Sequence, residues 1–528
     1  MQGLQGAGGI NVMKIPQHNG AIVGKAAVVA ALGSRHSAPQ RLAWPLLPGL
    51  GTAFYRAPTM PFDFLGNPLD TDHAPSIAAI DDFIGGMLAY HPRALNILPA
   101  ADRHPDSALL QALAGILMMF DESPRAAELA TPYLAAALAS SARASGATQL
   151  RAELYTQALH AWVHDDLHAV LALTEQLLHQ YPHDLFAAKL NQYVHFNRGD
   201  WPALLRIGLK AREHNPDNAH ALGMLAFGFE QCHLLADAEA TARQALALQP
   251  DEPWAQHALA HVMLTEGRID QGTDFLESVS RGWDGLNSFM YTHNWWHLAL
   301  FHLARGNQTR VLQIFDEHLW GIAPAYSQDQ IGAVSMLARL ELAGVDVGPR
   351  WKALAEYLKA RANDTVQPFL SVQYLYGLAR AGASEADQLL QALRDKAQTA
   401  AALEQPLWQR ITLPLAQGLL AHARGDFVLS RERLAHVMPS LNAIGGSHAQ
   451  RDLFALIEQD ASLRAGDWLD SQQRLEQRRR FDPWDLPTNR QLARVYAALG
   501  LPQQAEEAQS RVTWVLARDE LAGGSPRP

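Results

Sequence analysis

The chain contains a single cysteine, Cys232, among its 528 residues. It therefore has no disulfide framework and no cage of thiolate metal ligands, and a reducing compartment is expected. Charged residues are also few, at 18%, and the formal net charge is -10. The densest basic run is Arg478–Arg480, which we expect to be the solvated end of a helix. Because no long basic stretch is present, we expect no nucleic-acid partner.

Long apolar runs are missing as well. The stretch from Ala21 to Leu32 is apolar but short, and Lys25 interrupts it, so it cannot cross a bilayer. It also lacks the charged region and the small-residue cleavage site of a secretory signal. We therefore expect no membrane partner and a cytoplasmic protein. Residues 1–60, rich in glycine and proline, are expected to form a poorly ordered leader, and residues 521–528 a disordered tail.

What the chain does have is a regular alternation of amphipathic windows and short breakers. From about Ile77 onward the windows are rich in alanine and leucine, and no period-two run competes with them. Pro182, Pro216 and Pro250 lie thirty-four residues apart, which is the tetratricopeptide period. We predict an all-α fold, a tetratricopeptide-type α-solenoid over residues 61–520, in which each proline follows the second helix of a repeat.

Small residues agree with this register. Ala226, Ala238 and Ala245 fall where the two helices of one repeat must approach closely. Glycine-containing turns are expected between helices at Gly199–Asp200, Gly267–Arg268, Gly306–Asn307 and Gly425–Asp426.

Two histidine pairs lie one repeat apart in this register. His257 and His261, like His293 and His297, are spaced by four residues, so each pair shares one face of a helix. The offset between the pairs is thirty-six residues for both members. The register places them on the concave groove, together with His220, Gly223, Phe227, Glu230, Trp254 and Met290.

Two interpretations of the histidines remain open. A histidine on an alanine- and leucine-rich helix is usually a satisfied core residue, and the chain has 23 histidines, so chance pairs occur. Two pairs in register on adjacent helices favour a site. Neutral imidazoles beside a carboxylate suit a divalent transition metal such as zinc, iron, manganese, cobalt or copper. Proton transfer without a metal is the alternative, because histidine titrates near neutrality.

Several motifs together resemble the tetratricopeptide repeat protein 38 family, which includes StaR-like bacterial members. They are PWAQHALAH (253–261), THNWWHLAL (292–300), FDEH (315–318), SMLARLELAG (335–344), VGPRW (347–351) and GGSHAQRD (445–452), and the resemblance spans roughly residues 63–500. It implies a helical-repeat protein, and some bacterial members accompany natural-product biosynthesis, where an oxidative tailoring role is supposed. The family motifs match His257, His261, His293, Asn294, Trp296, His297, Asp316, His318, Gln450, Arg451 and Asp452.

The chain departs from the family pattern at outer polar positions. The family has histidine, acidic or other polar residues where this chain has Ala152, Gln192, Tyr193, Gly332, Ser371 and Gln373. These departures imply either altered substrate contacts or a lost activity, and retention of the four central histidines favours altered contacts.

The segment GGSHAQRD also has a physical interpretation. Gly445–Gly446 ends one helix and Ser447 can cap the next. Arg451 then lies in the first turns, where it can hold an anion or form a structural ion pair. A segment so late in the chain could close the solenoid back onto its groove.

Two functions follow. The first is a pocket protein, favoured as an enzyme, in which His257, His261, His293 and His297 hold a metal or move protons for a small molecule. Its substrate pocket is predicted to contain Trp254, Phe227, Glu230, Asn294, Trp296 and Arg451. The second is a scaffold whose concave groove binds a protein or peptide.

Overall fold

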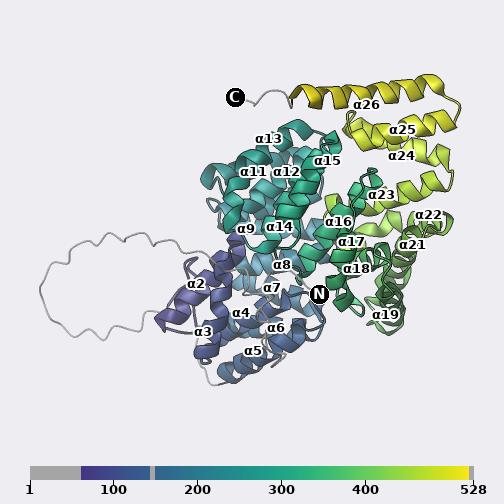
Figure 1. The fold of residues 1–528 in the computed structure, drawn as a ribbon. Coiled ribbons are helices and arrows are strands. Elements are labelled where there is room, and N and C mark those ends of the chain that lie inside the picture. The colour runs from purple at the N-terminus through teal and green to yellow at the C-terminus, as the bar shows by residue number, and fades with distance from the viewer. Residues whose placement is uncertain (1–60, 143–148, 523–528) are drawn as a thin grey trace, which may run out of the picture.

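The computed structural model describes residues 61–142 and 149–522. The predicted leader and most of the predicted tail lie outside these residues. Within them the chain is all-α and has no strand; its one isolated bridge joins Phe62 to Pro68. Antiparallel helix pairs follow one another along the chain (Figure 1). The predicted fold class, a helical-repeat solenoid, is confirmed.

The first half of the fold consists of helices joined by short turns. Their bounds are α2 (Ala74–Ala89), η1 (Pro92–Asn96), α3 (Ile97–Arg103), α4 (Ala108–Met119), α5 (Ala126–Ser141), α6 (Gln149–Val163), α7 (Leu167–Gln180), α8 (Leu185–Asn197), α9 (Trp201–His214), α10 (Ala219–Gln231), α11 (Leu235–Leu248), α12 (Pro253–Thr265) and α13 (Ile269–Val279).

The second half continues the pattern with more irregular turns. Its elements are η2 (Ser280–Gly285), α14 (Ser288–Arg305), α15 (Gln308–Ile314), η3 (Phe315–Leu319), α16 (Ser327–Leu342), α17 (Arg350–Leu358), η4 (Lys359–Arg361), α18 (Pro368–Arg380), α19 (Glu385–Thr399), α20 (Gln405–Leu407), η5 (Trp408–Thr412), α21 (Leu413–Ala423), α22 (Phe427–Val437), η6 (Met438–Ile444), α23 (His448–Arg464), α24 (Trp468–Phe481), α25 (Leu486–Ala498) and α26 (Pro502–Ala522).

The predicted repeat boundaries are confirmed at the helix caps. α7, α9 and α11 each end two residues before one of the three periodic prolines. The next helix then begins at an acidic or amide side chain that accepts a backbone N–H: Asp184 for α8, Asn218 for α10 and Glu252 for α12. Ala226, Ala238 and Ala245 are fully buried, as the close approach of paired helices requires.

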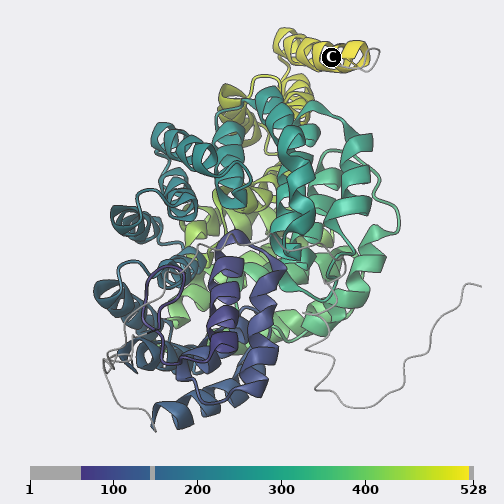
Figure 2. The same cartoon turned by 90° about the vertical axis from the view of Figure 1, so that its left-hand side faces the viewer.

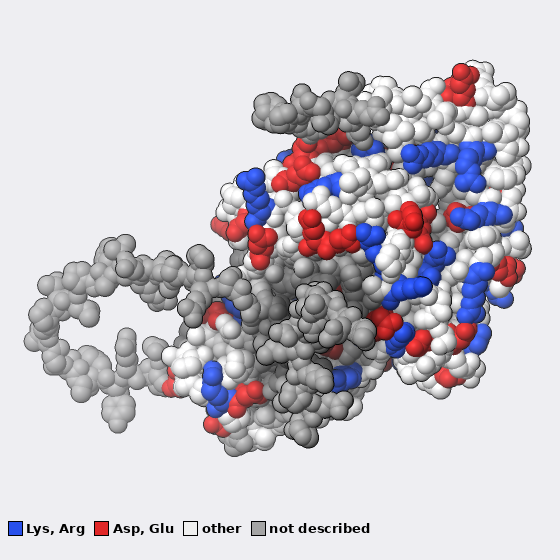
Figure 3. Space-filling model, in the orientation of Figure 1, with Lys and Arg blue, Asp and Glu red and all other residues white. Residues whose placement is uncertain are grey.

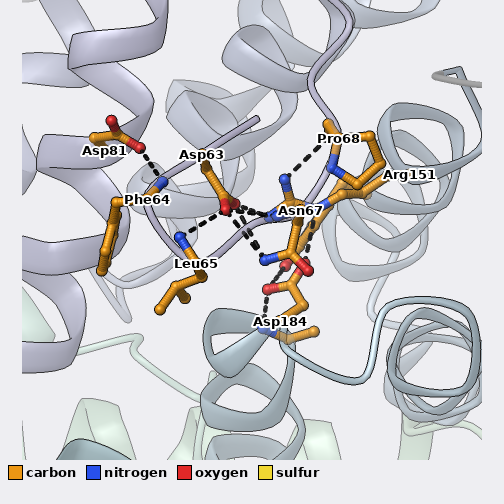
Figure 4. Close-up of polar contacts among 10 residues, drawn as sticks. Asp63, Phe64, Leu65, Asn67, Pro68, Asp81, Arg151 and Asp184 are labelled. Carbon is orange, nitrogen blue, oxygen red and sulfur yellow. Dashed lines mark hydrogen bonds and ion pairs between the residues drawn. The ribbon is translucent and has the colours of Figure 1, made fainter. Parts of the chain in front are cut away.

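The first described segment is held by a buried ion-pair network. Figure 4 shows Arg151 of α6 between two aspartates: Nη2 lies 2.9 Å from Asp63 Oδ2, and Nε lies 2.8 Å from Asp184 Oδ2. Asp63 also accepts the backbone N–H of Leu65 and Asn67. Because all three charged side chains are buried, the network fixes residues 63–67 against the start of α8.

The late helices pack against the turns of the early repeats. A Cβ at Gly199, in the α8–α9 turn, would lie 1.9 Å from the Asn442 carbonyl oxygen of η6. A Cβ at Gly267, in the α12–α13 turn, would lie 2.0 Å from the Phe481 carbonyl oxygen. Arg305 Nη1 lies 2.7 Å from Asp482 Oδ2 beside the latter contact. The solenoid therefore closes back on itself as the sequence suggested, while α26 remains at the periphery in Figures 1 and 2.

Charged side chains of both signs are interspersed on the face shown in Figure 3. The basic run ends α24 as predicted, but two of its members form ion pairs: Arg478 Nη1 lies 2.6 Å from Asp452 Oδ1, and Arg479 pairs with Glu476. Within the described ranges, no helix has both the length and the apolar character needed to cross a bilayer.

Candidate metal centre and adjoining cavity

The structure brings the four predicted histidines together. His257 Nε2 lies 3.0 Å from His293 Nε2 and 3.1 Å from His261 Nε2. One ring nitrogen from each of these residues and from His297 lies within 4.8 Å of the others. His261 and His297 are completely buried, so the cluster is inside the protein.

Two helices supply this cluster. α12 begins at the capping carboxylate of Glu252 with Pro253 in its first turn, and α14 begins at the Asn287 cap. The four-residue spacing places each histidine pair on one face, and the two faces meet where α12 packs on α14. The site thus arises because equivalent helices of adjacent repeats each carry a histidine pair with the same four-residue spacing.

A buried carboxylate orients one of the histidines. Glu230 of α10 is completely buried, and its Oε1 lies 3.2 Å from His261 Nδ1 and 2.9 Å from His448 Nε2. Burial alone would raise the pKa of Glu230, but the neighbouring His261 and His448 imidazoles hold it well below its usual range. The ionised carboxylate favours a proton on His261 Nδ1, which leaves Nε2 free to donate a lone pair toward the cluster.

Three of the four histidines are held in the neutral form. Burial lowers the pKa of His257 and His297 well below the usual value and that of His293 to about 3; the neighbouring histidines lower all three further. Neither ring nitrogen of His297 has a hydrogen-bond partner among the described residues, nor does Nδ1 of His257. Buried polar atoms are rarely left unpaired, so these nitrogens point to a missing ligand.

The donor set fits a divalent transition metal. Ligand nitrogens at about 2.0 Å from a tetrahedral zinc ion lie about 3.3 Å from one another. The two nitrogen–nitrogen distances of 3.0 and 3.1 Å are close to this value. Four imidazoles suit zinc, copper, iron or nickel better than calcium or magnesium, which prefer oxygen ligands.

A cavity of about 300 Å³ adjoins the cluster, and His257 and His293 form part of its wall. Its lining is mainly aromatic and aliphatic, including Phe227 and Trp254. The Trp254 ring stacks on that of His257 with 4.4 Å between centroids. A molecule bound in the cavity would therefore contact the same imidazoles that form the candidate metal centre.

The structure separates the predicted pocket residues into two groups. Phe227 and Trp254 line the cavity, and Glu230 lies behind the cluster. Asn294, Trp296 and Arg451 do not line it.

Each of these three residues has another environment. Trp296 is buried and stacks on the far side of the cluster, 5.5 Å from the His293 ring centroid. Asn294 is buried, and its side-chain amide has no partner among the described residues. Arg451 donates to the Gly446 carbonyl oxygen, and its guanidinium lies 4.9 Å from the Trp201 ring centroid. Arg451 forms no ion pair with a described residue. The carbonyl of Gly446 and the ring of Trp201 take the place of the carboxylate that the structural interpretation expected.

His448 is the main residue that the sequence interpretation missed. It lies in GGSHAQRD, where Ser447 and Gln450 form the expected cap, a capping box. The neighbouring Asp452 pairs with Arg339 and Arg478, whereas His448 contacts Glu230. Because the segment 445–452 was expected to close onto the groove, a histidine within it was a candidate neighbour of the groove histidines.

The departures from the family pattern have local structural roles. Tyr193 lines the cavity and donates to Glu122 Oε1 at 2.7 Å, and Gln192 donates to the Leu204 carbonyl oxygen. Ser371 and Gln373 donate to carbonyls one turn earlier. A Cβ at Gly332 would meet open space. Ala152 is buried in the core.

Asp316 and His318, which also match the family motifs, lie away from the histidine cluster. Asp316 forms an ion pair with Arg350, with 2.5 Å between Oδ2 and Nη2. The His318 ring stacks on Trp295 with 3.8 Å between centroids.

No model of a known protein family matches this chain. Solved structures with some likeness include a human IFIT1 dimer with PPP-AAAA, at 13% identity and a TM-score of 0.37, covering 78% of this chain and 91% of that one. A Rap protein complexed with competence and sporulation factor is 11% identical with a TM-score of 0.34, covering 79% of this chain and 99% of that one. These values carry no functional argument. The resemblance to the tetratricopeptide repeat protein 38 family remains a prediction.

Proposed function

We propose that this protein binds one divalent transition metal on His257, His261, His293 and His297 and acts on a small molecule in the adjoining cavity. The observation that supports this most directly is that His297, buried within the cluster, has no partner for either ring nitrogen among the described residues. A metal would bind one of the two unpaired ring nitrogens of His297 together with Nε2 of His257, and the His257–His293 edge would place it next to the substrate.

The reaction class depends on which metal is bound. The oxidative tailoring implied by the family resemblance requires a redox-active ion such as iron, copper or manganese, whereas zinc would act as a Lewis acid only by taking the substrate as a fifth ligand. If the site holds no metal, the four imidazoles could instead move protons. Metal identity therefore decides between these hypotheses.

Elemental analysis of protein purified without a histidine tag tests the proposal. We expect about one metal ion per chain in the wild type, as for a single site with four ligands. The double variant His257→Ala/His293→Ala should lose the metal. The matched control is His160→Ala/His164→Ala, since these residues have the same four-residue spacing but are exposed and stack only on each other.

Absence of bound metal, together with no change in Tm when zinc, iron, copper or manganese is added, would remove the metal hypothesis and leave proton transfer. Metal loss in His160→Ala/His164→Ala, with metal retained in His257→Ala/His293→Ala, would assign binding to surface histidines.

The alternative function, a scaffold for a protein or peptide in the concave groove, fits the interior less well. α23 brings His448 against Glu230 and Thr265, with 3.0 Å between His448 Nε2 and Thr265 Oγ1. This part of the groove is therefore filled by the chain itself. A cytoplasmic location and the absence of nucleic-acid and membrane partners remain expectations from the sequence.

A further inference from the structure

A lysine ammonium group lies in the wall of the cavity without an anionic partner. Lys189, on α8, lines the same cavity as His257 and His293. Its Nζ lies 3.8 Å from the centroid of the Tyr90 ring and 5.8 Å from that of Trp254. Among the residues that the structure describes, no hydrogen bond or ion pair involves this Nζ, so aromatic faces are its main contacts.

The nearby carboxylates are already engaged. Glu252 accepts the backbone N–H of Ala255 as the cap of α12 and lies 3.1 Å from His220 Nδ1. Glu122, which also lines the cavity, accepts from Tyr193, Ser327 and Gln328. Burial lowers the pKa of Lys189 to about 7, which the Glu252 charge only partly offsets. Lys189 is partly buried, and an ammonium removed from much of its water is stabilised most by an anion that can accept its hydrogen bonds.

Aromatic rings connect this lysine to the histidine cluster. Trp254 stacks on Tyr90 with 5.3 Å between centroids and an interplanar angle of 29°. The same indole stacks on His257 with 4.4 Å between centroids. A flat molecule lying along Trp254 could thus contact Lys189 at one end and the His257–His293 edge at the other.

Building on the metal and cavity function proposed above, we propose that the substrate is a small aromatic carboxylic acid whose carboxylate binds the Lys189 ammonium. A monoanion fits better than a phosphate, because the cavity offers one lysine and is otherwise mainly apolar, with Asp121 and Glu122 in its wall. The aromatic body matches the rings of Tyr90, Phe227, Trp254 and Phe289. Lys189 is then a substrate-binding residue that sets which end of the molecule faces the histidines.

The test compares three fluorescent probes of one shape: 2-naphthoate, 2-naphthylmethanol and 2-naphthylmethylammonium. Binding to the full chain is measured by titration after the metal has been removed with a chelator, so that a metal cannot hold the carboxylate. We expect 2-naphthoate to bind at least about tenfold tighter than the alcohol, the size of one hydrogen bond to a charged group, and the ammonium probe to bind weakest.

Lys189→Met should abolish the preference for the carboxylate while leaving the affinity for the alcohol unchanged. Lys189→Arg should retain the preference. Lys210→Met is the control, since Lys210 lies on the outside of α9 near Glu175. Unchanged Tm and metal content in Lys189→Met would show that the fold and the histidine cluster are intact.

Equal binding of the carboxylate and the alcohol by the wild type would overturn the proposal, as would persistence of the preference in Lys189→Met. These outcomes are separate from failure of the metal hypothesis. A protein that holds no metal yet shows the Lys189-dependent preference would retain the anion site and lose the metal function. A protein that holds metal but shows no preference for the carboxylate would retain the metal function and lose the anion site.

Discussion

His261 Nδ1 lies 3.2 Å from Glu230 Oε1, while Nε2 of the same ring lies 3.1 Å from His257 Nε2. A carboxylate behind one nitrogen fixes the tautomer and directs the other toward the cluster, as at many histidine-ligated metal sites. Glu230 itself is held by His448 and by Gln231, whose Nε2 lies 2.6 Å from Oε2. The orientation of His261 thus depends on the late segment that closes the solenoid.

Replacing Glu230 with glutamine should weaken metal binding without removing a ligand. The amide keeps the shape of the side chain but removes the negative charge that holds the His261 Nδ1 proton. We expect the Kd for the metal to rise about 10- to 100-fold, the usual effect of losing such a partner. Competition with a chelating dye measures this change. Glu239→Gln, which removes an external carboxylate paired with Arg268, should leave the Kd unchanged.

The variant His297→Leu should have opposite effects on the metal-free and metal-loaded protein. Neither ring nitrogen of His297 has a partner among the described residues, so leucine should raise the free energy of unfolding of the metal-free protein by about 1–3 kcal/mol. With metal present the wild type should be the more stable, because a ligand at 100 times its Kd adds about 2.7 kcal/mol. Urea unfolding with and without chelator measures both.

His422→Leu provides the control for this reversal. Nδ1 of His422 lies 3.1 Å from the Tyr376 hydroxyl and Nε2 lies 2.9 Å from Asp460 Oδ2, so both nitrogens have partners. This variant should be destabilised whether or not metal is present. If His297→Leu behaves in the same way, the unpaired nitrogens of His297 are not the origin of the effect.

The metal-free protein should lose stability steeply on acidification. His257, His293 and His297 stay neutral in the folded state, whereas the unfolded chain binds protons below pH 6.5. The unfolded state therefore holds more protons. As the pH is lowered, the free energy of unfolding decreases by about 1.4 kcal/mol per pH unit for each group. The effect begins near pH 6.5 and, for His293, continues to about pH 3.

Asp329 opposes this trend in part of the same range. Burial raises its pKa to about 7, so its protonation favours the folded state as pH falls from 7 toward 3.8. Burial also raises the pKa of Asp364 and Asp485, which act in the same direction as Asp329. It lowers the pKa of His195, His233 and His318, which act in the same direction as the cluster, so we expect a net loss of stability. Urea unfolding at pH 7.5, 6.5 and 5.5 measures the slope, and His297→Leu should reduce it by one group. A slope that does not change in this variant would contradict the assignment.

Sequence periodicity predicted the repeat fold and the convergence of the histidines because both depend on local rules. The thirty-four-residue spacing fixes which helix faces meet, and the four-residue spacing fixes which side chains share a face. His448, Lys189 and Tyr90 were not identified because their positions depend on packing between distant repeats. Trp296 shows the same limit: its place beside His293 is set by which side of α14 faces the cavity.

The Arg151 network should be essential to the start of the fold. Arg151→Met would leave Asp63 and Asp184 buried without their cation, at a cost of about 3–5 kcal/mol. Adding Asp63→Asn should recover part of this loss, because it removes one of the two uncompensated charges. Urea unfolding measures the two changes, and protease cleavage near residue 63 reports release of the segment. A double variant less stable than the single one would contradict this account.

Closure of the solenoid should be sensitive to a single methyl group at Gly199. The backbone there has φ of 65°, and an added Cβ would lie 1.9 Å from the Asn442 carbonyl oxygen. Gly425 is the matched control, because it ends the equivalent turn before α22 with φ of 83° and has open space around it. Gly425→Ala should cost about 1–2 kcal/mol from backbone strain alone, whereas Gly199→Ala should cost clearly more.

The added loss should come from separation of η6 from the α8–α9 turn. Hydrogen exchange in η6, residues 438–444, should then accelerate in Gly199→Ala and remain unchanged in Gly425→Ala. Because His448 follows η6 by only four residues, the metal Kd should also rise in Gly199→Ala alone. Equal destabilisation by the two substitutions, with η6 protected in both, would mean that the contact with Asn442 does not hold the solenoid closed.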